Sequence, residues 1–289
     1  RIARVSDFRE NKRFHVDGAD NTLEQVDQQA EYPEEKVTEG KYSYAVKKYG
    51  RRIPFSWESM INDDLDALQD MPRRLGRAAR RTEQRFAAGL YVGSDGPLGT
   101  FFKSANNNIV TGHPPLSIEA LQLAMQIIGN KTDANGEPIA IDMLHLVVPP
   151  ALMVTAQNIL NAIQIEATNG GGTSNQKIHA QNWMANMLRL SVDPYIPVIA
   201  TNNKNSSWFL FADPADNRPA LEMGFLRGHE SPEIFIKAPN ARRVGAGEVD
   251  PMAGDFDNDS INYKVRHVLG GTQMDPKMAL ASNGSGSTG

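Results

Sequence analysis

The sequence predicts an α+β fold, and three features lead to this prediction. Residues 61–90 carry apolar side chains at helical spacing, and residues 143–160 read as a buried strand followed by a helix. Short strand patterns return in the last third of the chain. With 289 residues, of which 40% are hydrophobic and 22% charged, the chain has globular proportions and suits one large domain or two closely joined ones.

Composition excludes several classes of protein. The chain has no cysteine, which rules out disulfides, thiol catalysis and thiolate metal sites. A formal charge of −4 argues against a protein whose main work is to bind nucleic acid through phosphate contacts. No apolar run approaches the roughly 18 to 20 residues of a membrane span, and no signal peptide is recognisable at the start, so we expect no membrane association.

The net charge of the chain changes sign abruptly near its start. Residues 1–13 hold five basic side chains, whereas residues 17–35 hold seven acidic ones and no Lys or Arg. Few large apolar side chains occur in the acidic stretch, which is typical of an extended arm. Such an arm is ordered when it lies along another surface, for which a partner subunit is a natural candidate; the alternative is a disordered terminus.

Residues 36–57 have the signature of a β-hairpin. Apolar and polar residues alternate through Tyr42, Tyr44 and Val46, a turn is expected at residues 47–50, and the pattern continues to Trp57. Its charges are too dense for a buried sheet, so the hairpin is expected to project from the body. The alternative is a solvated edge hairpin of the core sheet.

Residues 61–90 predict a long amphipathic helix, with Ser59 or Asn62 as its cap. Pro72 is expected to kink the helix or to open its second half, and Gly93 and Gly96 are expected to end it. Acidic side chains crowd the first half and six arginines the second, an order that complements the helix dipole. Pairing of these arginines across an interface is favoured over contact with DNA, and a solvated face is the default alternative.

The remaining elements follow from shorter patterns. Residues 116–128 predict a helix capped by Ser117 and stopped at Gly129, and residues 166–176 a flexible loop. Strands are expected in four segments, and residues 282–289 are expected to be an unstructured tail. The four segments are residues 195–201, 207–213, 233–238 and 261–269.

Motifs of catalysis or metal binding are absent from the sequence. The six histidines are scattered, and there is no HExxH, GxSxG or phosphate-binding loop. Asp255, Asp257 and Asp259 alternate as in a calcium loop, but Ser260 and Arg266 occupy the positions that require Gly and Glu. The sequence therefore predicts no catalytic residue, no cofactor-binding residue and no metal site.

Four segments in this order resemble the major capsid protein of tailed bacteriophages, the Hong Kong ninety-seven fold. Residues 61–102 are similar to the spine helix and following turn of the Mu-like major head subunit, and the later segments are residues 115–128, 144–160 and 261–280. The resemblance covers residues 32–281. It implies an N-terminal arm over 1–31, an extended loop over 32–57, a peripheral domain over 58–115 and 232–281, an axial domain over 116–231, and a flexible tail over 282–289.

The resemblance also implies a function: a structural, non-enzymatic protein that self-assembles as hexamers and pentamers into an icosahedral or prolate head shell around double-stranded DNA. It would be assembled in the host cytoplasm and become part of the virion, with portal, scaffold, head protease and decoration proteins as further partners. A bacterial encapsulin compartment is the alternative within the fold; a head-associated hydrolase and a DNA-binding module are alternatives from other classes. Some relatives carry isopeptide cross-links, but no motif here matches the partner site.

Charged residues of the loop and the helix are the candidates for contacts between subunits. They are Glu34, Glu35, Glu39, Lys41, Lys47, Lys48, Arg51, Arg52, Arg73, Arg77, Arg80 and Arg81.

Overall fold

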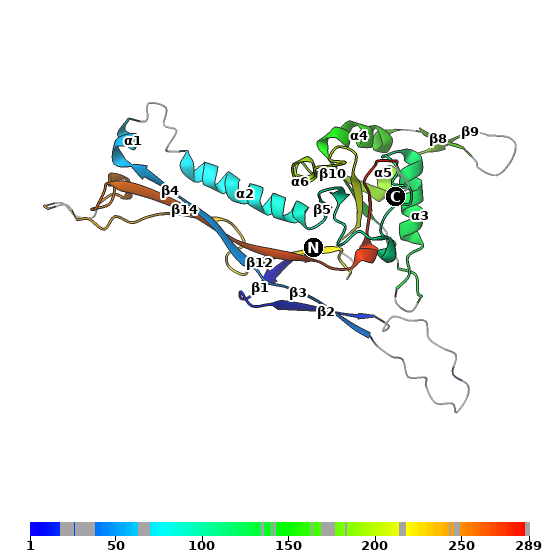
Figure 1. The fold of residues 1–289 in the computed structure, drawn as a ribbon, viewed down its shortest axis with the longest axis horizontal. Helices are drawn as coiled ribbons and strands as arrows, with labels where there is room; N and C mark the ends of the chain where they lie inside the picture. The colour runs from blue at the N-terminus through cyan, green and yellow to red at the C-terminus, as the bar shows by residue number, and fades with distance from the viewer. Residues whose placement is uncertain are drawn as a thin grey trace.

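Two β-sheets with packed helices organise the chain into an elongated molecule (Figure 1). The long first sheet and helix α2 (Met71–Gly89) occupy one end, and a compact second body occupies the other. This computed structural model describes residues 1–17, 26, 38–62, 70–133, 136–139, 141, 143–162, 164–168, 177–182, 184–213, 218–242, 244–245 and 249–286.

The first sheet is built around β14 (Ser260–Gln273), a strand of 14 residues. One edge of β14 pairs antiparallel with β4 (Lys47–Ser56), and the other edge pairs with β13 (Glu233–Ile236) and then β12 (Leu221–Leu226). β1 (Ile2–Val5) extends the sheet by pairing in parallel with β12. The alternating apolar residues of β14 explain its central position, because they supply the buried face of the sheet.

The second sheet has the order β10 (Leu188–Val192), β7 (Leu144–Val148), β11 (Trp208–Ala212) and β15 (Ala279–Ser282). Its buried side chains form the largest apolar cluster of the described residues, together with helices α3 (Ile118–Gly129) and α4 (Met153–Asn161). The predicted capping of α3 is confirmed, since Ser117 Oγ accepts a hydrogen bond from the Ala120 N–H at 3.1 Å.

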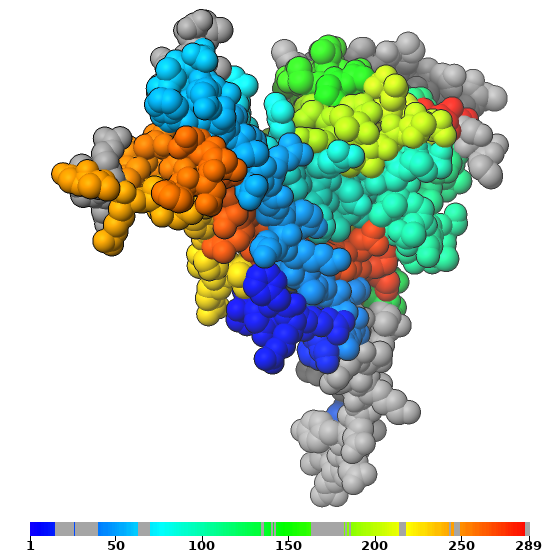
Figure 2. All heavy atoms as spheres, turned by 60° about the vertical axis from the view of Figure 1, so that its left-hand side comes forward, coloured from blue at the N-terminus to red at the C-terminus, as the bar shows by residue number. Residues whose placement is uncertain are grey.

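Smaller elements complete the described chain. Three two-stranded ladders join β2 (Asn11–Asp17) to β3 (Thr38–Tyr44), β5 (Val92–Gly93) to β6 (Gly96–Pro97), and β8 (Gln164–Thr168) to β9 (Lys177–Gln181). The short helices are α1 (Trp57–Ile61), α5 (Met184–Met187) and α6 (Ile196–Ile199). In Figure 2 the dark-blue N-terminal residues lie below the lighter blue residues that follow them, apart from the green and yellow-green residues of the second body.

The predicted opening of a helix by Pro72 is confirmed. Pro72 lies in the first turn of α2, where its missing N–H costs no hydrogen bond. Ser56 rather than Ser59 or Asn62 caps the preceding helix α1, and Asn62 closes it. α2 ends at Gly89, one residue earlier than predicted, and Gly93 and Gly96 pair with each other in the β5–β6 ladder that follows. Of the helix predicted over residues 61–90, Asn62 closes α1, residues 63–69 lie outside the described residues, and α2 begins at Met71.

The predicted hairpin with a turn at residues 47–50 is wrong. β3 and β4 pair with different strands: β3 pairs with β2, and β4 pairs over ten residues with β14. The dense charge of β4 is tolerated because β4 is an edge strand whose basic side chains are exposed. The projecting hairpin is therefore β2–β3, and β4 belongs to the body.

Three other expectations at the level of elements need correction. Residues 2–5, at the start of the predicted arm, lie along β12 of the same chain, whereas a partner subunit was the surface expected. Residues 195–201 contain α6 instead of a strand, with a proline in the first turn of the helix. Ser282 is fully buried in β15, and Gly286 N–H donates to the His113 carbonyl at 2.8 Å, so the tail does not begin at residue 282.

Strand pairing also joins segments that the predicted domain boundaries assign to different domains. β12 falls within residues 116–231 but pairs with β14 of the first sheet. β15 falls within residues 232–281, apart from Ser282, yet it pairs with β11 of the second sheet. The predicted loop over residues 166–176 lies largely outside the described residues, except where it contributes the ends of β8.

Candidate interaction surface

Positive charge is concentrated on α2 and β4. Together these two elements carry ten basic residues and a single acidic one, Glu83, although the whole chain is negative. Eight of them, the six arginines of α2 and the two residues of β4 on the side of the sheet that α2 covers, are called the basic surface: Lys47, Arg51, Arg73, Arg74, Arg77, Arg80, Arg81 and Arg85. All eight are exposed, so the surface is available to an anionic partner.

The packing of α2 explains why its arginines face outward. Leu75 and Ala79, one helical turn apart, are buried against Ile261, Tyr263 and Val265 of β14. Because this narrow stripe is the side of the helix that meets the first sheet, the arginines on the remaining circumference are left in solvent.

Several arginines of α2 form ion pairs within their own helix. Asp70 lies 3.3 Å from Arg77, 3.6 Å from Arg74 and 3.9 Å from Arg73, measured between nitrogen and oxygen atoms. Arg80 pairs with Glu83 at 3.0 Å. These exposed pairs are each worth roughly 0–1 kcal/mol and leave most of the positive charge uncompensated.

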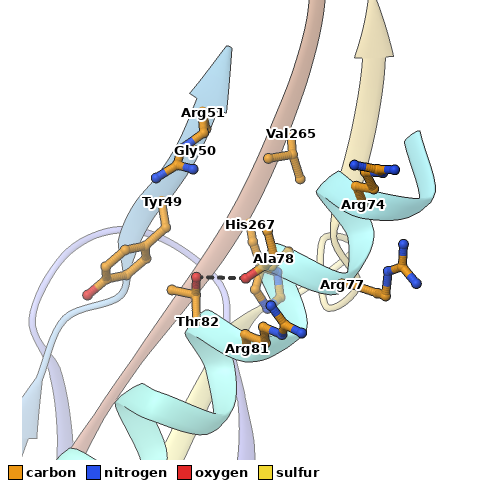
Figure 3. Close-up of a pocket in the computed structure, with 11 residues that line it drawn as sticks. Tyr49, Gly50, Arg51, Arg74, Arg77, Ala78, Arg81, Thr82, Val265 and His267 are labelled. Carbon is orange, nitrogen blue, oxygen red and sulfur yellow. Dashed lines mark hydrogen bonds between the residues drawn. The ribbon is translucent and has the colours of Figure 1, made fainter. Parts of the chain in front are cut away.

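A groove of about 570 Å³ runs between β4 and α2, with β14 as its floor (Figure 3). Arg51 lines it from β4, and Arg74, Arg77 and Arg81 line it from α2. Within the described residues, neither Arg51 nor Arg81 has an acidic partner within 4 Å. Two guanidinium groups with no acidic partner in the described parts of the chain thus line the groove from its opposite walls.

A second opening of about 530 Å³ lies along another side of α2. Arg77, Arg80 and Arg81 line it, together with Ser231 and Pro232. Arg77 and Arg81 therefore line both openings, so α2 forms a basic ridge with a hollow on either side. This arrangement suits an extended anionic segment better than a compact ligand.

His267 lies at the floor of the groove and is almost completely buried, with 2% of its surface exposed. Its Nε2 is 3.5 Å from a carboxylate oxygen of Glu83, and neither ring nitrogen has a hydrogen-bond partner among the described residues. Burial lowers the pKa of His267, against the opposing effect of Glu83, because the charged imidazolium loses its hydration. The groove floor is therefore neutral near pH 7.

The structure separates the other predicted contact residues. Lys47 and Arg51 alternate with Lys48 and Arg52 along β4, so the two pairs point to opposite faces of the first sheet. Lys41 is exposed on β3. Glu34 and Glu35 lie outside the described residues; Glu39 is in β3, where its side chain is not described.

Glu222 is a buried carboxylate that sequence reasoning missed. It lies in β12 with no exposed surface and accepts hydrogen bonds from Arg13 and Tyr44. The alternating pattern of residues 221–226 was the available signal for a strand, but nothing local marks Glu222 as buried.

No cluster of three or more potential metal ligands occurs in the described parts of the chain. Asp255 instead accepts hydrogen bonds from Ser260 N at 2.9 Å and from Lys237 Nζ at 3.0 Å. These bonds hold the pKa of Asp255 well below its usual range, the Ser260 N–H first among them. Where helices are described, none is both long and apolar enough to cross a membrane.

Comparison with known proteins decides what kind of molecule carries this surface. The family described as phage capsid protein matches residues 40–282. This chain belongs to that family. No curated protein matches the sequence of this capsid protein.

Solved structures from phages share the fold of this capsid protein at low sequence identity. A structure from Mycobacterium phage Ogopogo is 15% identical with a TM-score of 0.52, covering 96% of this chain and 88% of the other. The capsid structure of cyanophage P-SCSP1u is 11% identical with a TM-score of 0.54, covering 97% and 84%. The capsid asymmetric unit of cyanophage Pam1 is 8% identical with a TM-score of 0.53, covering 95% and 85%.

Family membership confirms the prediction that the chain is a structural capsid protein. The chain is a structural major capsid protein, a component of the virion that self-assembles into a shell, and it is not an enzyme. None of these comparisons favours the encapsulin alternative.

Proposed function

We propose that this capsid protein has the Hong Kong ninety-seven architecture of the Mu-like type, with α2 as the spine helix. The first sheet and α2 then form the peripheral domain, the second sheet with α3 and α4 forms the axial domain, and β2–β3 is the extended loop. Support comes from the ladder of β2 with β3, which among the described strands is separate from both sheets and contacts the first sheet at its base. This division replaces the sequence-based boundaries, because each sheet gathers strands from distant parts of the chain.

The subunits would associate as hexamers and pentamers, in the host cytoplasm, into an icosahedral or prolate head around double-stranded DNA. Portal, scaffold, head protease and decoration proteins would be further partners. Copies of the chain itself are the principal partner, because a shell requires one complementary surface repeated by symmetry.

The groove between β4 and α2 is the basis of our proposal for how copies of the chain recognise one another. Residues 17–35 contain seven acidic residues and no basic one, and the groove presents Arg51 and Arg81, for which the described ranges supply no acidic partner. We place the acidic segment of one copy, including Glu34 and Glu35, against the groove of a neighbouring copy. Charge complementarity of this kind sets register and association rate more than it sets final affinity.

Charge reversal of Arg51 and Arg81 tests this pairing. In R51E/R81E the rate and yield of shells, followed by sedimentation and electron microscopy, should fall several-fold at low salt and recover partly when Glu34 and Glu35 are changed to Lys. R189E/K204E is the matched control, since Arg189 and Lys204 are exposed on the second body. Equal effects of the two double variants would refute pairing at the groove.

Contact with DNA is the competing role for the basic surface. If R51E/R81E assembles like wild type while the wild-type chain binds duplex DNA with a steep salt dependence that the variant lacks, the basic surface faces nucleic acid instead.

Replacement of residues 14–41 by a short Gly-Ser turn tests the extended loop. The subunit should stay folded, because β2 and β3 pair only with each other, but closed shells should not form. If this variant forms shells as the wild type does, the proposal that β2–β3 is the extended loop is refuted.

A further inference from the structure

One buried carboxylate holds both strands of the β2–β3 hairpin at its base. Glu222 Oε1 accepts a hydrogen bond from Arg13 Nε of β2 at 2.8 Å and another from the Tyr44 hydroxyl of β3, also at 2.8 Å. The second oxygen, Oε2, is 3.7 Å from Arg1 Nε. We refer to Glu222, Arg13 and Tyr44 as the Glu222 cluster.

Besides these bonds, the hairpin is held at its base by packing of β3 against β14 and by the short link from β3 to β4 through Ala45 and Val46. Its strands form a separate two-stranded ladder, and among the described strands neither shares a backbone ladder with the sheet that contains Glu222. A ladder bond would fix the relative orientation of two strands, whereas here the side-chain bonds to Glu222 act together with the packing at the base. The apolar contacts at this base are those of Tyr44, Val46, Val5 and Val268.

Close packing leaves the Glu222 cluster little freedom. Glu222 has no exposed surface and Tyr44 has 7%. The ring of Tyr44 lies so close to β12 that a Cβ on Gly224 would be 2.5 Å from it. Burial, followed by the bond to Glu222, raises the pKa of Tyr44 to about 12, and the same carboxylate raises the pKa of Arg13. Arg13 is therefore charged and Tyr44 a neutral donor at all ordinary pH values.

We infer that Glu222 is a positioning residue: it sets the direction in which the β2–β3 hairpin leaves the body, and thereby the ability of the hairpin to reach a neighbouring subunit. Its effect on assembly rests on the proposed role of the hairpin as the extended loop. The direction of the hairpin itself does not depend on that role.

The substitution Glu222→Gln keeps the shape of the side chain but removes its charge. Loss of a charge-assisted, buried hydrogen bond should increase local opening about tenfold or more. In Glu222→Gln, amide hydrogen exchange should therefore accelerate by that factor in residues 11–17 and 38–44. The exchange rates in β7 and β11 should remain those of the wild type. The assembly rate of the full chain should fall by a similar factor.

Two further sets of variants make the test specific. Arg13→Gln should reproduce the Glu222→Gln effects and Arg13→Lys should largely restore wild-type behaviour, which a mere packing role would not predict. Glu230→Gln is the control, since Glu230 pairs with Arg4 at 3.3 Å next to the same sheet and has no described contact with the hairpin. If Glu222→Gln does not fold, Tyr44→Phe, which removes only the hydroxyl, should show the same localised change at smaller size.

The outcomes separate the inference from the proposed function. Unchanged hairpin exchange in Glu222→Gln and Arg13→Gln, or equal acceleration in both sheets, would overturn the positioning role. Localised acceleration with normal shell assembly would uphold Glu222 as the residue that holds the hairpin and would overturn the extended-loop proposal instead.

Discussion

Leu75 should hold α2 on the first sheet, and its truncation to alanine is the most direct test of that packing. Leu75 is 2% exposed and contacts the cluster of Ile261, Tyr263 and Val265, to which α2 contributes only one other buried residue, Ala79. Leu75→Ala removes the equivalent of three buried carbon groups, worth about 2.4 kcal/mol in transfer free energy. A residual cavity raises the expected loss to about 3 kcal/mol.

Thermal and urea unfolding of the unassembled subunit measures this loss. For a chain of this size, about 3 kcal/mol corresponds to a decrease of roughly 6–12 °C in Tm. Hydrogen exchange should accelerate most in α2, because the helix loses its main contact with β14. Shell assembly should slow as well, since the basic surface depends on the placement of α2.

Leu123→Ala provides the matched control for this experiment. Leu123 lies in α3 and is 39% exposed, so the same chemical change should cost less than about 1 kcal/mol. A loss below about 1 kcal/mol for Leu75→Ala, or equal losses for the two variants, would contradict the reasoning that this contact anchors α2.

Three other perturbations test separate parts of the structure. The lowered pKa of His267 means that the folded state disfavours its charged form. The free energy of unfolding should therefore decrease as pH falls below about 6.5, by at most about 1.4 kcal/mol per pH unit. Urea titrations should show a shallower decrease for His267→Gln. Deletion of residues 36–52 should unfold the first sheet, as monitored by circular dichroism, because it removes part of β4; a folded product would contradict the β4–β14 pairing. Gly224→Ala should lower Tm through a clash with the aromatic ring 2.5 Å away, at a cost of about 1–3 kcal/mol, whereas Gly89→Ala, with open space around it, should leave Tm unchanged or raise it.

Local signals in the sequence determined several elements correctly. Ser117 and Gly129 bound α3, Pro72 opens α2, and the apolar runs of β7, β11 and β14 are strands as predicted. These features depend on contacts within a few residues, such as a cap, a fixed φ angle or an apolar period, which a single sequence displays. The order of the segments was likewise sufficient to indicate a phage capsid protein, which the family match confirms.

Tertiary structure alone decided which strands pair and where the functional charges meet. β1 pairs with β12 and β4 pairs with β14, each across some 200 residues of chain, so no local pattern distinguished these partners from the neighbouring β3. Arg51 and Arg81 face one groove only because α2 lies over this sheet. Glu222 resembles any other acidic residue in the sequence; its role follows from its burial beside Arg13 and Tyr44, which distant segments create when the chain folds.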